Sequence, residues 1–333
     1  MENVQVTGSA SAHGLVTPAA AAPRLSARTI QVALGVIWLL DGLFQFKSFM
    51  YTHGIVSEVF APAASGQPGF IGGPMRTFDD FYGSDLTLFN TLAGEIQVAI
   101  GLGLMVSRKT VKPALIASFL WAPVVWWFGE GFGGLTSHTL PSPLMGAPGA
   151  VILYAIVGAL VWPCEDRDGR SPAGSSALGE RPGLIAWSLL WGLASALWLV
   201  NVNRAPGATS EMIKSMAEAS PHWLAKIQEW AVRQTDGHGT TIAIVLAVVS
   251  ALIAFSVWTP WRRPALILAI ALSLAYWVFG QSIGGPFWVE SATDVNSGPL
   301  FVLLALTLYP VARRAGRARE PAGSVEVASA SAV

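Results

Sequence analysis

The chain has 333 residues, of which 53% are hydrophobic and only 12% are charged. Soluble globular proteins are about one quarter charged, so this composition excludes a water-soluble enzyme and a disordered chain. Twenty Lys and Arg residues balance twenty Asp and Glu residues, which leaves no charge excess to attract nucleic acid. The single cysteine, Cys164, excludes an intramolecular disulfide and a redox relay of paired cysteines. A polytopic membrane protein is the class that remains.

Eight windows of mostly apolar residues are long enough to cross a lipid bilayer as helices. They cover about residues 29–46, 86–106, 111–129, 147–163, 184–202, 240–258, 264–281 and 298–312. The sequence therefore predicts an all-α fold with eight transmembrane helices embedded in a lipid bilayer.

Lys and Arg residues are distributed unevenly between the two sides of such a membrane protein. With both termini inside, fourteen of the twenty fall in cytoplasmic segments and six fall in outer loops. Cytoplasmic loops are the ones enriched in Lys and Arg. We therefore expect a multi-pass protein of the cytoplasmic membrane with both termini in the cytoplasm.

The two halves of the chain resemble each other at an offset of about 150 residues. The segment 126–134 (WWFGEGFGG) aligns with 277–285 (WVFGQSIGG), Pro113 aligns with Pro264, and Gly42 aligns with Gly192. A fixed offset of this kind indicates internal duplication. Because each unit would hold an even number of spans, the two units would enter the membrane in the same direction as a parallel repeat.

This alignment predicts the domain organisation. We expect a disordered cytoplasmic tail at 1–27, a first four-helix repeat at 28–163, a polar cytoplasmic linker at 164–183, a second four-helix repeat at 184–313 and a cytoplasmic tail at 314–333.

Each repeat has one long outer loop, at 47–85 and 203–239. In the second loop, apolar residues recur at helical spacing, which predicts one or two short amphipathic helices. The first loop is rich in Gly and Pro and is expected to form turns.

Ionisable side chains inside predicted spans are candidates for function, because burying them in a bilayer is costly. Asp41 and Glu95 are the two clear cases, and we expect them to approach each other and line an outward-opening pocket as a catalytic pair. The alternative is that each carboxyl group only fixes helix packing through hydrogen bonds. Both carboxylates belong to the first repeat, because the second has apolar residues at the matching positions. Polar neighbours that would contact a substrate are Gln45, Asn90 and Gln97.

The aligned glycine-rich motif ends the third and seventh spans. Its aromatic residues suit the headgroup region and its glycines suit a helix stop. Alternatively, the motif forms a lip around a ligand whose ring stacks on Trp126 or Trp127, with Glu130 and its counterpart Gln281 as polar contacts. The five histidines lie outside the spans and lack metal-ligand spacing, so no metal or intramembrane haem is expected.

One repeat resembles the DoxX-like proteins, which are small bacterial four-span membrane proteins. The resemblance rests on the four-span layout and on the segments LGVIWLLDGLFQF (34–46) and LFNTLAGEIQVAIGLGL (88–104). The family includes the small membrane subunit of thiosulfate:quinone oxidoreductase. This resemblance implies a fusion of two such units and a role in quinone-linked redox chemistry, with quinone as the implied ligand and a redox or extracytoplasmic protein as partner.

Two other functions are compatible with the same residues. The carboxylates could bind a cation or couple proton movement in a small-solute or ion transporter. The outer loops could instead anchor or assemble an extracytoplasmic partner. In that case Trp223 and Trp230 would matter more than Asp41 and Glu95.

Overall fold

The computed structural model describes residues 26–163, 178–285 and 287–309, and within these ranges every regular element is a helix. The predicted tails and most of the predicted linker lie outside the described residues. The elements are α1 (Ala27–Phe44), η1 (Ser48–Tyr51), η2 (Val56–Phe60), α2 (Ala61–Ala64), α3 (Gly69–Ser84), α4 (Leu86–Val106), α5 (Arg108–Val124), η3 (Val125–Gly129), η4 (Gly131–Gly134), η5 (Pro143–Met145), α6 (Val151–Leu160), α7 (Glu180–Trp198), α8 (Asn201–Arg204), α9 (Ala208–Glu218), α10 (His222–Thr235), α11 (Gly239–Ser256), α12 (Arg262–Phe279), η6 (Ser282–Gly284) and α13 (Ser297–Leu308).

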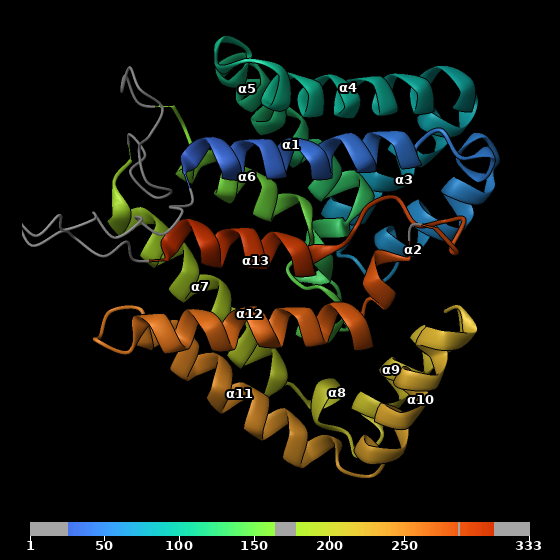
Figure 1. Ribbon diagram of the computed structural model, residues 1–333. Helices are drawn as coiled ribbons and strands as arrows, with labels where there is room; N and C mark the ends of the chain where they lie inside the picture. The colour runs from blue at the N-terminus through green and yellow to red at the C-terminus, as the bar shows by residue number, and fades with distance from the viewer. Residues whose placement is uncertain (1–25, 164–177, 286, 310–333) are drawn as a thin grey trace, which may run out of the picture.

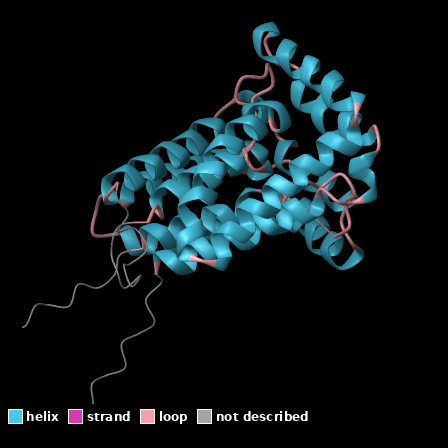
Figure 2. Cartoon of the chain, turned by 90° about the horizontal axis from the view of Figure 1, so that it is seen from above, coloured by secondary structure: helices cyan, strands magenta, loops and turns pink. Residues whose placement is uncertain are grey.

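The apolar helices α1, α4, α5, α6, α7, α11, α12 and α13 form one bundle (Figures 1 and 2). The main hydrophobic core runs through its centre and contains residues of both halves of the chain, such as Trp38, Leu115, Trp187 and Leu304. The all-helical fold expected from the sequence is therefore confirmed. The two halves share a core and do not form separate bodies.

In the described part of the chain, five helices are long and apolar enough to cross a membrane: α1, α4, α5 continued through η3, α11 and α12. The remaining three expected spans are different. Helix α7 has 19 residues but begins with Glu180 and Arg181, whereas α6 and α13 have only 10 and 12 residues. A helix of ten residues is about 15 Å long, half the hydrocarbon thickness of a bilayer.

Helices α6 and α13 are short because irregular backbone precedes each of them. Gly146 and Gly149 have φ of 104° and 105° before α6, and Asn296 has φ of 66° before α13. Non-helical backbone at membrane depth is tolerated where protein covers it or where it lines a cavity. The residues nearest the starts of α6 and α13 are covered by protein, since Ala147, Ala150 and Val295 are buried, and Glu130 and Asp294 of these segments contribute to the site described below.

Helices α1 and α4 pack closely because glycine residues replace side chains at their contact. A Cβ atom added to Gly42 would lie 2.7 Å from the backbone nitrogen of Val98, and one added to Gly101 would lie 2.6 Å from that of Leu39. Small residues that allow close backbone approach are a common device in membrane helix pairs. This contact leaves the opposite face of α4 at the edge of the bundle (Figure 1).

Short helices gather at one end of the bundle in two groups, α2 with α3 and α8 with α9 and α10 (Figure 1). The helices predicted for the second loop are α9 and α10. The expectation of turns in the first loop is wrong for residues 69–84, which form the 16-residue helix α3. Its apolar face, with Ile71, Met75 and Tyr82 buried, outweighs the cost of its glycines.

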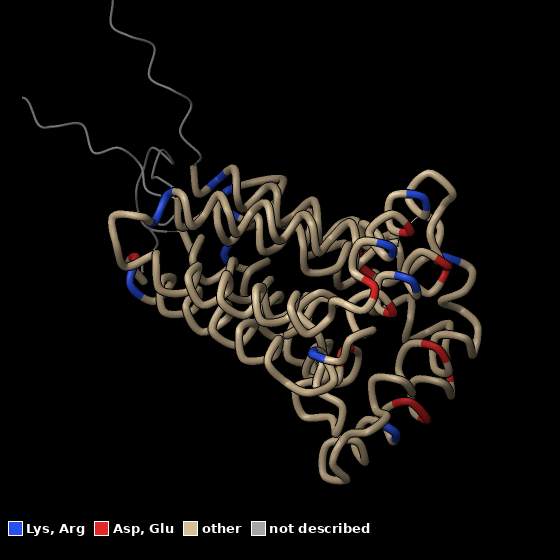
Figure 3. The backbone as a smooth tube through the Cα atoms, turned by 90° about the horizontal axis from the view of Figure 1, so that it is seen from below, with Lys and Arg blue, Asp and Glu red and all other residues tan. Residues whose placement is uncertain are grey.

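Charged residues differ between the two ends of the bundle (Figure 3). The end that carries the α4–α5 and α11–α12 turns holds mainly Arg and Lys, with Glu180 as the acidic partner of Arg262. The opposite end holds basic residues as well as most of the acidic residues.

Candidate functional site

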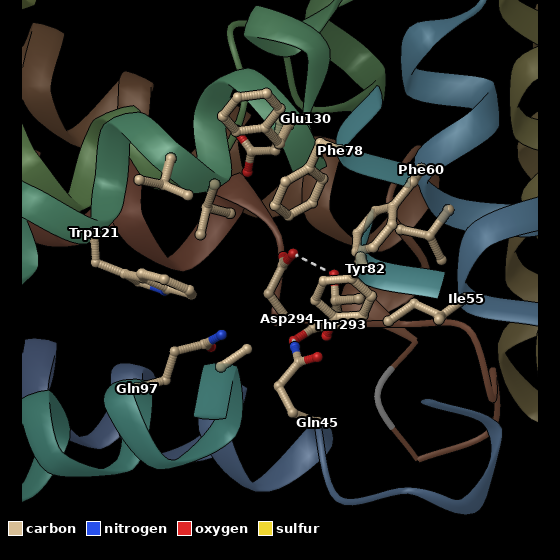
Figure 4. Close-up of a pocket in the computed structure, with 16 residues that line it drawn as sticks. Gln45, Ile55, Phe60, Phe78, Tyr82, Gln97, Trp121, Glu130, Thr293 and Asp294 are labelled. Atoms are coloured by element: carbon tan, nitrogen blue, oxygen red, sulfur yellow. Dashed lines mark hydrogen bonds between the residues drawn. The ribbon is translucent and has the colours of Figure 1, made fainter. Parts of the chain in front are cut away.

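A cavity opens between the N-terminal half of α4 and the C-terminal end of α5 and reaches the loop that precedes α13 (Figure 4). Its volume is about 600 Å³, including its open mouth. Most of its wall is apolar, and the polar groups are few. The lining residues are Gln45, Ile55, Val59, Phe60, Phe78, Tyr82, Ala93, Gln97, Trp121, Val124, Val125, Phe128, Gly129, Glu130, Thr293 and Asp294.

Aromatic residues of η2, α3, α5 and η3 make the apolar wall. Phe60 and Tyr82 meet edge to face with ring centroids 5.0 Å apart, and Phe78 stacks on Phe128 at 4.5 Å. The indole nitrogen of Trp121 is buried without a hydrogen-bond partner. This wall therefore offers flat apolar surfaces and one unsatisfied N–H donor.

The end of α1 and the start of α4 place the amide side chains. Gln45 Nε2 donates to the carbonyl oxygen of Thr293 at 3.3 Å, and Asn90 Nδ2 donates to the carbonyl oxygen of Gln45 at 2.6 Å. Tyr82 in turn donates to Asn90 Oδ1 at 3.1 Å. Gln45 and Gln97 line the cavity, whereas Asn90 lies behind Tyr82 and fixes its position.

Glu130 is held at the N-terminus of α6. Its Oε1 accepts hydrogen bonds of 3.0 Å from the backbone N–H groups of Ala150 and Val151. Its Oε2 is buried without a partner. Burial raises the pKa of Glu130 to about 8, the negative field of Asp294 raises this pKa further, and the two backbone N–H groups oppose the shift. At neutral pH this carboxyl group is mainly protonated and can donate a hydrogen bond from Oε2.

Asp294 lines the same cavity from the second half of the chain (Figure 4). Thr293 Oγ1 donates to its Oδ2 at 3.0 Å, and the N–H of Asn296 donates to its Oδ1. Burial raises the pKa of Asp294, although both hydrogen bonds and nearby Lys47 oppose the shift. The expectation that such carboxylates belong only to the first repeat is therefore wrong. The sequence does not single out Asp294, because it lies in a loop outside the predicted spans and nothing in its neighbouring residues predicts that this loop turns inward.

Asp41 is buried in α1, with 3% of its surface exposed. It accepts hydrogen bonds from the phenol of Tyr154 and from the backbone N–H of Val295. The predicted pairing of Asp41 with Glu95 does not occur, because Glu95 projects from the exposed face of α4. The helical period of α4 does not predict which of its faces packs on α1. The face that carries Gly94 and Gly101 does so, because these glycines allow the two helices to approach closely.

Trp126 and Trp127 lie beside the cavity and do not line it. Trp126 Nε1 donates to the carbonyl oxygen of Pro148 at 2.9 Å, and Trp127 stacks on Phe128 and Phe132. The residues of this segment that do face the cavity are Phe128, Gly129 and Glu130. Trp121, one to two turns earlier on α5, presents the indole ring that the sequence motif suggested for Trp126 or Trp127.

The counterpart motif in the second half makes matching contacts. Trp277 Nε1 donates to the carbonyl oxygen of Val295 at 2.8 Å, as Trp126 does to Pro148. Gln281 Oε1 accepts from the N–H of Gly298 at 3.1 Å in the first turn of α13, as Glu130 does at α6. Gln281 does not line the cavity, and its role is to hold the start of α13.

Within the described ranges, no three His, Cys, Asp or Glu side chains are grouped to hold a metal ion, which leaves the cavity as the candidate site. A second hollow lies on the other side of Glu130 and Asp294, and Ser142, Gly146 and Asn296 also line it. The two carboxyl groups therefore lie between the apolar cavity and this polar hollow. Comparison of the chain with known protein families, curated proteins and solved structures finds no match.

Proposed function

We propose that this chain is an integral membrane protein that binds a lipid-soluble ligand of the quinone class in the cavity between α4 and α5. The observation that carries the proposal is a pair of unsatisfied hydrogen-bonding groups in an aromatic cavity. Trp121 Nε1 and Glu130 Oε2 are both buried without a partner, and both residues line the cavity. A buried donor without an acceptor is costly, so such groups mark a place where a ligand completes the hydrogen bonding.

A quinone headgroup matches these walls. Its ring is flat and apolar, as the surfaces of Phe78 and Phe128 require, and its two carbonyl oxygens are acceptors for Trp121 and for protonated Glu130. The buried amides of Gln45 and Gln97, which also line the cavity, supply further polar contacts. The resemblance of each half to DoxX-like proteins points to the same ligand class.

Glu130 and Asp294 are suited to exchange protons with such a ligand. Reduction of a quinone to a quinol takes two electrons and two protons. A carboxyl group with a pKa of about 8 gives up and regains a proton near neutral pH, which suits it to acid–base work. The electrons come from a partner redox protein or a bound reductant, because no described side chain is grouped as a redox centre.

The same proposal includes a two-repeat architecture with eight membrane segments and cytoplasmic termini. The matching contacts of Trp126 with Trp277 and of Glu130 with Gln281 support the duplication. The concentration of Arg and Lys at one end of the bundle supports the orientation (Figure 3). In this arrangement α6 and α13 are half-length helices whose N-termini hold the polar residues of the site, as in transporters with broken helices.

The test is a binding titration of the purified protein in lipid nanodiscs with a short-chain ubiquinone, followed by tryptophan fluorescence. We expect Trp121→Phe and Glu130→Leu to weaken binding about tenfold each, because each loses a hydrogen bond of roughly 1.4 kcal/mol in the complex. Trp261→Phe is the matched control, because Trp261 is 71% exposed and remote from the cavity. Equal affinity in all three variants, or no binding by the unaltered protein, would refute the proposal.

Helix α10 supports a second candidate function, the anchoring of an extracytoplasmic partner. Trp223, Ile227 and Trp230 are exposed at spacings of four and three residues, which places them on one face of the helix. An exposed aromatic face of this kind is typical of an interaction surface. If anchoring is the function, Trp223→Ser with Trp230→Ser abolishes activity in cells, while Asp41→Asn leaves it intact.

A further inference from the structure

The second hollow, beside Glu130 and Asp294, has walls unlike those of the aromatic cavity. Its volume is about 580 Å³, including its open mouth. None of the described residues that line it is aromatic, and its other polar side chains are Ser142 and Asn296. A water molecule occupies about 30 Å³ of liquid and needs polar partners, so this hollow suits several water molecules better than an apolar ring.

Glu130 and Asp294 form the wall between the hollow and the cavity. Among the described residues, these two alone line both. Glu130 Oε1 accepts its 3.0 Å hydrogen bond from the N–H of Ala150, which lines the hollow. Asp294 accepts one hydrogen bond from Thr293, which lines the cavity, and one from the N–H of Asn296, which lines the hollow. Each carboxyl group is therefore fixed where it borders both spaces.

The unpaired oxygen of Glu130 lies next to the hollow. Gly149 lines the hollow, and a Cβ atom added to it would clash with Glu130 Oε2. The φ of Gly149 is 105°, a conformation that other residues rarely adopt. A glycine at this position therefore keeps Oε2, which has no partner among the described residues, beside a space that suits water.

We propose that this hollow is the route by which protons pass between the surrounding water and the carboxyl groups of Glu130 and Asp294. A proton that leaves Glu130 is taken up by water in the hollow, and Glu130 regains a proton from the same water. No electron moves in this step. The inference rests on the proposed function, because the ligand in the cavity is the group that exchanges protons on the other side of this wall.

The position of the hollow indicates which side of the membrane supplies the protons. Helix α5 starts at Arg108, at the basic end of the bundle, and the hollow lies beyond its far end (Figure 3). In the proposed orientation this is the outer end. Asp41 of α1 and Lys47 also act on the two carboxyl groups through their charges. Acidic groups outnumber basic groups in this set, which favours the arrival of a proton over that of an anion.

The test measures hydrogen–deuterium exchange at the Glu130 carboxyl group by infrared spectroscopy of the protein in lipid bilayers perfused with D₂O. The C=O stretching band of the protonated group shifts on deuteration, and its loss in Glu130→Gln identifies it. Spectra are recorded at about pH 6, where Glu130, with a pKa of about 8, keeps its proton.

A thiol reagent that carries a quaternary ammonium group closes the hollow after folding. It is applied to Met145→Cys in a background in which Cys164→Ser removes the native thiol, since Met145 is half-buried and lines the hollow. We expect the exchange rate to fall about fivefold or more, because exchange then requires local opening of the chain. Reduction with dithiothreitol removes the block and should restore the rate.

Two variants serve as controls. Leu140→Cys accepts the same charged group on the same loop, but Leu140 is exposed and does not line the hollow, so the exchange rate should not change. Val124→Trp fills the cavity instead, and it should abolish ubiquinone binding without slowing exchange. Exchange that is unaffected by modification of Met145→Cys, or that is slowed by Val124→Trp, overturns the proposed route.

The ubiquinone titration separates this inference from the proposed function. If the block slows exchange but the unaltered protein binds no ubiquinone, the proposed function fails and the proton route stands. If ubiquinone binds and exchange does not respond to the block, the proton route alone is refuted.

Discussion

Asp41 accepts a hydrogen bond of 3.2 Å from the backbone N–H of Val295, which follows it by 254 positions in the sequence. The same carboxyl group accepts a hydrogen bond from Tyr154 in the last helix of the first half. One buried side chain of α1 therefore joins α6 to the loop before α13. The loop brings Thr293 and Asp294 to the cavity, so the second half of the chain completes the candidate site.

Removing this junction should destabilise the protein. Asp41→Leu leaves the hydroxyl group of Tyr154 and the N–H of Val295 buried without acceptors, and we expect the free energy of unfolding to fall by about 3 kcal/mol. Asp41→Asn retains one acceptor oxygen, so its free energy of unfolding should fall by less than that of Asp41→Leu. Thermal unfolding in nanodiscs measures both. An unchanged melting temperature in Asp41→Leu would mean that the junction contributes nothing to stability.

The stability of the protein should fall as the pH rises from about 4.5 to about 8. The pKa of Glu130 is raised from 4.5 to about 8 in the folded chain, so in this window the folded state binds a proton that the unfolded state has lost. The free energy of unfolding then decreases by up to about 1.4 kcal/mol per pH unit for one group. Asp294 shifts in the same direction and adds to the fall.

Glu130→Gln isolates the contribution of Glu130 to this pH dependence. The amide keeps an acceptor for the N–H groups of Ala150 and Val151 but cannot ionise. We expect melting curves between pH 5 and pH 9 to show a shallower decline in the variant, with the largest difference above pH 7. Parallel declines in the two proteins would assign the pH dependence to other groups.

The close contact of α1 with α4 should tolerate no added methyl group at Gly42. A Cβ atom there lies 2.7 Å from the backbone nitrogen of Val98, so Gly42→Ala forces the helices apart. Gly192, the aligned residue of α7, is the matched control, because nothing lies within 4 Å of its added Cβ. We expect Gly42→Ala to lose about 2 kcal/mol of stability and Gly192→Ala to gain up to about 1 kcal/mol from helix propensity. Equal effects would contradict the packing described.

Lys47 should control ligand binding at a distance. Its Nζ donates to the carbonyl oxygens of Val289 and Ala292 at 3.0 and 2.7 Å, which ties the loop before α13 to the end of α1. In Lys47→Met the loop loses these two hydrogen bonds, and we expect Asp294 to be held less firmly at the cavity. We expect ubiquinone affinity to fall severalfold, while the exposed control Lys226→Met binds normally. Equal affinities would show that Lys47 does not position the loop.

Much of this architecture could be predicted from the sequence because it depends on local patterns. Apolar windows of helical length are visible in α1, α4, α5, α11 and α12, since the lipid or the core demands apolar residues at every turn. The repeated W-x-F-G motif predicted ligand contacts for both Glu130 and Gln281, whereas in the structure both hold the start of a following helix and only Glu130 of the two lines the cavity. These features need no knowledge of which elements meet.

Features that depend on contacts between distant segments, such as the partner of Asp41 and the position of Asp294, are fixed only by the tertiary structure. Whether Asp41 faces Glu95 or Tyr154 is set by the glycines that choose the packing face of α4, and a helical period fixes only relative directions. Asp294 reached the site because the loop before α13 turns inward and hydrogen-bonds to Asp41, Gln45 and Lys47. The residues around Asp294 have the composition of an ordinary polar loop and do not predict this inward turn. The sequence by itself determined which residues are helical and apolar, whereas the meeting of the two halves around one cavity arises from packing between residues about 250 positions apart.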